Sequence, residues 1–127
     1  MTFLEEVLAS VEANEKEVFA HETVARTWGD REFIFKIHAK PQSVKNKIVA
    51  YLAKGKATVL KDPFKFDFMC IQAYVTDEAG NPLFAELSED NRTKLCQFPP
   101  ELVEELHSVA LRLNGFTKED QEELENF

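Results

Sequence analysis

Apolar residues near the start of the chain are spaced so that they fall on one face of a helix. They recur at intervals of three and four residues, which is the helical period. Thr2 and Glu5 stand three residues apart, in the register of an N-terminal capping box. We therefore expect a short amphipathic helix here. Its apolar face consists of Phe3, Leu4, Val7, Leu8 and Val11.

The next segments are rich in β-branched and aromatic residues. Residues 18–27 read VFAHETVART and residues 31–39 read REFIFKIHA, and Gly29 and Asp30 between them suit a tight reversal. This arrangement predicts an antiparallel β-hairpin. Alternation along the second strand gives it a face that packs inward. The residues of that face are Phe33, Phe35 and Ile37.

Helical spacing returns after Pro41, which ends the second strand. The following helix closes at Gly55 and carries one apolar stripe. Residues 64–75 are so apolar that they predict a buried helix, although periodicity alone leaves a strand open. Asp62 and Pro63 suit the N-cap and first position of a helix, which favours the helix. The stripe before Gly55 consists of Val44, Ile48, Tyr51 and Leu52.

A turn signal follows at residues 74–84, YVTDEAGNPLF. Gly80 tolerates a positive φ, Asp77 and Asn81 can bond to nearby amides, and Pro82 fixes φ. After this turn, the chain is expected to return to the core. The residues that re-enter it are Leu83 and Phe84.

The rest of the chain predicts helices. Ser88 caps a helix that runs to Phe98, and a longer one follows from Pro100. Asn114 and Gly115 form a helix terminator, and a last, acidic helical turn or two follows. The residues that begin that turn are Thr117 and Asp120.

These elements predict an α+β fold, with one mostly helical domain over residues 1–127 and a small antiparallel β-hairpin near the N-terminus. The strand-containing front covers residues 1–40 and the helical body residues 41–127. A chain of 127 residues with 44% hydrophobic content and 11 Phe is large enough to bury a core of its own.

The net charge of −8 opposes general nucleic-acid binding, because phosphates would meet a repulsive average field. The charge is uneven. Residues 36–65 carry eight Lys against Asp62 alone, and residues 99–127 carry eight acidic side chains against Arg112 and Lys118. A solvated surface in each region is the simplest interpretation. The two regions are also complementary, so we expect head-to-tail contacts in a homo-oligomer.

The sequence offers no arrangement typical of catalysis or of a cofactor or metal site. Its histidines are scattered, and Cys70 and Cys96 lie apart in apolar segments, where we expect them in the core. It has no Walker loop, dinucleotide fingerprint or nucleophile elbow. It also lacks a run of about 20 apolar residues. We therefore expect no enzyme, no cofactor and no membrane partner, in a reduced, cytosolic setting.

Four aromatic side chains are the candidates for contact with a partner, because large aromatic rings carry much of the contact area in proteins. For each of them, a role in the core is the alternative. The candidates are Trp28, Phe84, Phe98 and Phe116.

The order of pieces in the C-terminal half resembles the tail assembly chaperones of long-tailed bacteriophages and prophages. An apolar helix is followed by a D-x-x-G-x-P-L-F turn, an S-E-D helix, an L-N-G helix end and an acidic close with E-x-N. In this chain the pieces are Asp77, Gly80, Pro82, Leu83 and Phe84, then Ser88, Glu89 and Asp90, then Leu113, Asn114 and Gly115, and finally residues 123–126.

This resemblance implies a protein that binds the tape measure protein, keeps it soluble and helps recruit tail tube subunits during tail morphogenesis. It implies action without catalysis or ATP in the cytoplasm of the bacterial host. It also implies that the protein is absent from the mature virion.

The resemblance further implies a longer product made by a −1 ribosomal frameshift, so a frameshifted version of this chain is an expected partner. Glu125, Asn126 and Phe127 mark the candidate position. Codon degeneracy permits GAA AAU UUU there, which contains the slip-prone run A AAU UUU. The gene sequence decides this point.

Two other interpretations remain open from the sequence. The first is a structural tail completion or head-to-tail connector protein, which would stay in purified particles. The second is a small DNA-associated regulatory protein that uses the Lys-rich residues 36–65.

Overall fold

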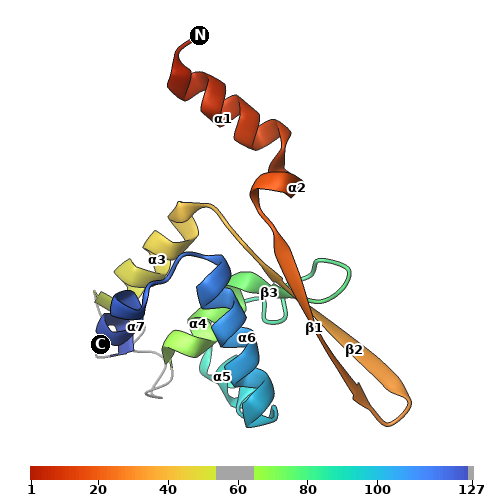
Figure 1. Ribbon diagram of the computed structural model, residues 1–127. Coiled ribbons are helices and arrows are strands. Elements are labelled where there is room, and N and C mark those ends of the chain that lie inside the picture. The colour runs from red at the N-terminus through yellow and green to blue at the C-terminus, as the bar shows by residue number, and fades with distance from the viewer. Residues whose placement is uncertain (54–64, 126–127) are drawn as a thin grey trace.

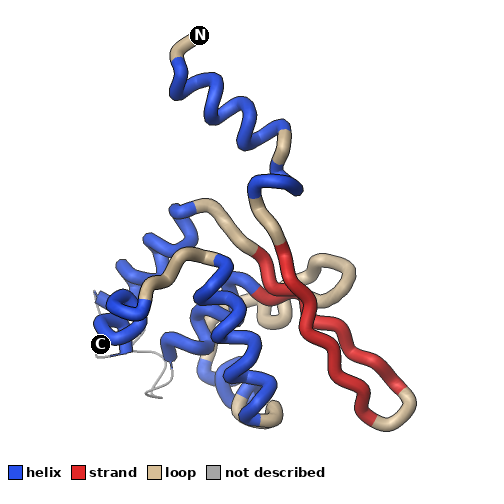
Figure 2. The backbone as a smooth tube through the Cα atoms, viewed as in Figure 1, coloured by secondary structure: helices blue, strands red, loops and turns tan. Residues whose placement is uncertain are grey.

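The computed structural model describes residues 1–53 and 65–125. It confirms the α+β class, since a mostly helical body carries a small antiparallel sheet with the order β1-β2-β3 (Figures 1 and 2). In chain order the described elements are α1 (Phe3–Ala13), α2 (Glu15–Val18), β1 (His21–Trp28), β2 (Arg31–His38), α3 (Gln42–Ala53), α4 (Lys65–Tyr74), β3 (Val75–Thr76), α5 (Glu89–Leu95), α6 (Pro100–Leu113) and α7 (Lys118–Glu125).

Helix α4 forms the centre of the core. Both α3 and α6 pack against it, and β3 follows it directly. The apolar run at this place is therefore a helix, as its pattern favoured, and not a strand. Its expected cap at Asp62 and Pro63, and the Gly55 end of the preceding helix, lie outside the described residues. The buried residues of α4 are Phe66, Phe68, Met69, Cys70, Ile71 and Tyr74.

The predicted hairpin is present, with a two-residue turn between β1 and β2. Gly29 in this turn has a φ of 64°, a conformation that favours glycine. A third strand, β3, adds to the sheet through the pairs Lys36↔Thr76 and Ile37↔Val75. The sequence did not reveal this strand, because two residues are too few to show an alternating pattern.

The turn at Asp77 has the local bonds that its sequence predicted. The Asp77 carboxylate accepts a hydrogen bond from the Asn81 backbone N–H at 2.9 Å, and this bond lowers the pKa of that carboxyl. Gly80 has a φ of 92°. The Leu83 N–H then donates to the Val75 carbonyl at 3.2 Å, which ties the end of the turn to β3. The segment therefore closes the edge of the sheet.

Asn114 joins the end of α6 to the end of the sheet. Its Nδ2 donates to the carbonyls of His38 at 3.0 Å and Ala110 at 2.9 Å, and its Oδ1 accepts from the Lys40 N–H at 2.8 Å. Gly115 follows with a φ of 70° and turns the chain towards α7. The L-N-G sequence is therefore both a helix end and a junction between distant elements.

Replacing Asn114→Ala should lower the free energy of unfolding by about 2 kcal/mol, because three hydrogen bonds are lost and each contributes about 0.5–1.5 kcal/mol. Urea denaturation measures the change. Asn46→Ala is the matched control, since the described Asn46 side chain is exposed and accepts one bond, from Gln42. Equal stability of the two variants would contradict a junction role for Asn114.

Candidate functional site

Helix α1 presents an apolar stripe that the rest of the described structure leaves uncovered. The Thr2 hydroxyl caps the helix by accepting from the Glu5 N–H at 3.2 Å, as predicted. None of the α1 residues is buried, and Figures 1 and 2 show the helix projecting away from the body beyond β1. Phe3 is 81% exposed, Leu4 65% and Leu8 60%. The amphipathic helix that the sequence predicted is therefore an arm.

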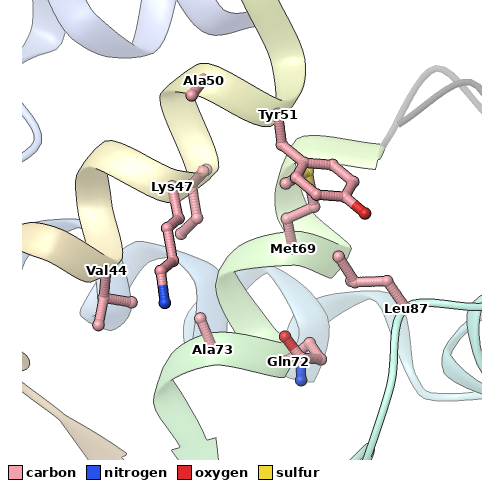
Figure 3. A pocket seen from close by; sticks show the side chains of 9 residues that line it. Val44, Lys47, Ala50, Tyr51, Met69, Gln72, Ala73 and Leu87 are labelled. Carbon is pink, nitrogen blue, oxygen red and sulfur yellow. The ribbon is translucent and has the colours of Figure 1, made fainter. Parts of the chain in front are cut away.

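A groove of about 460 Å³ lies between α3 and α4 on the body. Figure 3 shows the Tyr51 ring hanging from α3 beside Met69 of α4, with Leu87 approaching from the loop before α5. Tyr51 remains 39% exposed. The residues that line the groove are Val44, Lys47, Ile48, Ala50, Tyr51, Met69, Gln72, Ala73 and Leu87.

The chemistry of this groove suits an apolar helix better than a small polar substrate. The polar groups that line the groove are the side chains of Lys47 and Gln72 and the hydroxyl of Tyr51. None of the described lining residues is acidic. Concave apolar channels between helices are a recurrent mode of binding amphipathic helices in proteins. The groove and the α1 stripe are therefore the two surfaces best suited to contact a partner.

The four aromatic candidates lie in different places. Trp28, at the hairpin tip, is 43% exposed and packs on Phe33 with a centroid distance of 5.2 Å. Phe84 and Phe116 are buried in the core. Phe98 is partly buried and its ring lies 6.3 Å from that of Phe84. Of the four, Trp28 offers the largest exposed surface to a partner.

The sequence motifs also occupy architectural positions. Asp77, Gly80 and Pro82 form the turn at the sheet edge. Leu113 packs against the core beside the Asn114 junction. Glu125 ends α7, whereas Asn126 and Phe127, the remainder of the candidate frameshift position, lie outside the described residues.

Ion pairs tie the hairpin to α6. The Arg26 guanidinium donates to both carboxylate oxygens of Glu101, at 2.9 and 3.1 Å, and also to Glu105. These bonds raise the pKa of Arg26 and lower that of Glu101. Arg112 meets Glu22 of β1 at 2.5 Å. Two acids of α6, Glu101 and Glu105, are thus paired within the chain.

One C-terminal acid, Asp120, also pairs with the Lys-rich region inside one chain. Lys45 Nζ lies 3.0 Å from Asp120 Oδ2 and 2.9 Å from the Gly115 carbonyl oxygen. The Asp120 carboxylate accepts from the Thr117 N–H, and this bond, followed by that from Lys45, lowers the pKa of Asp120. Some of the opposite charges that we expected to pair between copies therefore pair within one chain.

One expectation about the cysteines is wrong. Cys70 is buried in α4 as expected, but Cys96 is exposed, since α5 ends at Leu95 and Cys96 lies in the turn that follows. Within residues 1–53 and 65–125, no group of three or more His, Cys, Asp or Glu side chains is placed to hold a metal ion. In the same residues, no helix combines the length and apolarity needed to cross a membrane.

Sequence reasoning did not find the groove. Tyr51 belongs to the apolar stripe predicted for α3, but Ile48 and Leu52 of that stripe are buried while Tyr51 stays open to solvent. The width of this apolar stripe could have indicated the groove, because α3 carries more apolar surface than its contact with α4 covers.

Comparisons with known proteins gave no match. No protein-family model, curated protein or solved structure matches this chain.

His107 is the one described histidine whose burial strongly changes its titration. Its ring lies edge-on to Phe66 at 5.1 Å, and its Nε2 is buried without a hydrogen-bond partner among the described residues. Burial lowers the pKa of His107 from 6.5 to about 4. The unfolded chain therefore binds this proton more tightly than the folded chain, and acid favours unfolding.

The stability of the protein should fall as the pH is lowered from about 6.5 to about 4, with His107 contributing up to about 3 kcal/mol. Above pH 6.5 the residue is neutral in both states and contributes no slope. Replacing His107→Gln removes the titration, so urea denaturation of this variant should show a flatter pH profile over that interval. The same slope in both proteins would contradict the assignment.

Proposed function

We propose that the protein is a tail assembly chaperone of a long-tailed bacteriophage or prophage. It binds the tape measure protein, keeps it soluble and helps recruit tail tube subunits, without catalysis or ATP. The observation that carries the proposal is the ordered set of motifs from Asp77 to Asn126. The groove between α3 and α4 supports it, because a long helical client exposes apolar faces that need temporary cover.

The groove is the proposed client site. It is open between two helices of the body, and a client helix laid in it would contact Val44 and Tyr51 on one side and Ala73 on the other. Such binding lowers the concentration of free client by mass action alone. The net charge of −8 keeps the complex dispersed. Action takes place in the host cytoplasm, before the virion is complete.

The longer frameshifted product is a further proposed partner. In this form an extension would continue the chain beyond α7. Because α7 packs against α3, the extension would start near the helix that forms one wall of the groove. An extension rooted there is well placed to bring tube subunits to a bound client.

Co-expression with the neighbouring tape measure gene tests the proposal. We expect the tape measure protein to move into the soluble fraction and to co-purify with this chain. The variant Tyr51→Glu should reduce the recovered client at least about tenfold, because a carboxylate would be desolvated inside an apolar contact. The control is Ala53→Glu, which adds the same charge on the exposed side of α3.

An insoluble client with nothing co-purified would contradict the chaperone proposal. Equal client recovery with both variants would place the client elsewhere and contradict the groove assignment alone. Mass spectrometry of purified particles separates the connector alternative, since a chaperone is absent from them and a connector keeps a fixed copy number.

A further inference from the structure

We propose that the α3–α4 groove of one copy receives helix α1 of a second copy, so that the protein assembles head to tail through a donated helix. The proposal rests on two uncovered surfaces of the same chain that match each other in polarity, charge and length. It needs no client, but α1 of a second copy and the client helix proposed above would occupy the same groove and therefore compete for it.

The first match is apolar. The α1 stripe and the groove are the two apolar surfaces described above, and each is open to solvent in a single copy. An isolated helix of 11 residues is only marginally stable in water. Because α1 has no packed face, a contact that covers Leu4 and Leu8 would stabilise the helix itself as well as the pair.

The second match is in charge. Helix α1 carries Glu5, Glu6 and Glu12, and the sequence has no Lys or Arg before Lys16. In the groove, the charged lining residue is Lys47, whose ammonium group extends into the space between α3 and α4 in Figure 3. An acidic amphipathic helix therefore meets a basic apolar groove, which favours this occupant over a second groove or a basic helix.

The third match is in length. The groove residues of α3 extend from Val44 to Tyr51, and the α1 stripe from Phe3 to Val11. These intervals are seven and eight residues, or about 10 and 12 Å at 1.5 Å per residue. The two surfaces can therefore align over about two helical turns, with aliphatic side chains of α1 against the Tyr51 ring and the small side chain of Ala73.

The geometry points to a second copy and not to the same chain. The root of the arm is fixed to the sheet, because His21 pairs with His38 and the Ala39 N–H donates to the Ala20 carbonyl at 2.9 Å. From this root, α2 and α1 lead away from α3 and α4 (Figures 1 and 2). A copy that donates α1 keeps its own groove open for another copy, so the contact is heterologous and extends to rings or open chains.

The size of the contact sets the expected strength. One short helix in a groove lies at the low end of the area of specific interfaces, so we expect association at micromolar concentrations. Sedimentation of the purified wild-type chain alone should show a mass that rises with concentration beyond a dimer. No client is present, so this result is independent of whether the chaperone proposal holds.

Two variants should each abolish this self-association. Leu4→Glu with Leu8→Glu removes the donated stripe, and Tyr51→Glu disrupts the groove. The dissociation constant should rise on the order of 100-fold for the pair, because burying each leucine is worth at least about a tenfold factor in affinity. Both leucines are exposed, so the body should still fold, and circular dichroism verifies this.

The matched controls add the same charges elsewhere. Ala9→Glu with Ala13→Glu has the same spacing on the opposite side of α1, because successive residues turn by about 100°. Ala53→Glu is the control for the groove. Both controls should associate like the wild type.

Mixing the two deficient variants provides the decisive test. The Tyr51→Glu chain keeps a working α1, and the Leu4→Glu/Leu8→Glu chain keeps a working groove. Together they should form a one-to-one dimer that grows no further, since the remaining donor and acceptor surfaces are disrupted.

Several outcomes would overturn the proposal. A wild-type chain that stays monomeric at all concentrations would show that α1 is free or folds onto its own groove. Persistent association of Tyr51→Glu would indicate pairing of α1 with α1, and persistent association of the α1 variant would indicate another surface such as the hairpin tip at Trp28. Failure of the mixture to restore a dimer would exclude the donated helix.

Discussion

Burial of helix α4 is the constraint on which the rest of the structure depends. Its apolar residues point in several directions around the helix, and a helix that is apolar on most sides has to be covered on most sides. The neighbouring elements supply that cover. Leu102 and Leu106 of α6 and Ile48 of α3 are all buried in the same cluster, and Phe84 closes on Phe68 after the turn.

The open surface of the protein follows from how this cover is distributed. Helix α6 and the return of the chain after the turn bury one part of α4 completely, and α3 crosses another part with only a section of its stripe. Met69 is buried, but Gln72 and Ala73 stay partly open beside Tyr51. The groove is therefore a by-product of a core helix that is more apolar than the helix packed beside it. Such an uncovered region is where an apolar partner gains most from binding.

Local sequence patterns predicted most of the secondary structure. The caps at Thr2 and Ser88, the Gly29 turn and the ends of α6 all depend on residues close together in the chain, where side chains and backbone interact directly. Strand β3 was missed because it depends on β2, which lies far away in the sequence. Thr76 is held in the sheet by its pairing with Lys36 and by a hydrogen bond of 2.8 Å between its Oγ1 and His38 Nε2.

The same limit applies to the candidate site. Residue type alone made Trp28 and Phe84 equal candidates for contact with a partner. In the structure, Trp28 is exposed at the hairpin tip and Phe84 is buried in the core. The difference comes from the position of each ring relative to α4, which no local pattern contains. The stripe of α1 was found correctly, but periodicity indicates that a face is apolar and not what covers it.

Helix α1 shows how an uncovered face becomes informative once the fold is known. In a core helix, an apolar stripe is explained by its neighbours, and nothing more follows. Here α1 is capped at Thr2 and ends at Ala13, and the N–H of the C-cap residue Asn14 donates to the Ser10 carbonyl, so the helix has well-formed ends but no buried residue. Caps contribute only about 1 kcal/mol, which is too little to hold a short helix in water. In the donated-helix proposal, the additional stabilisation comes from apolar contact with the groove beside Tyr51 of a second copy.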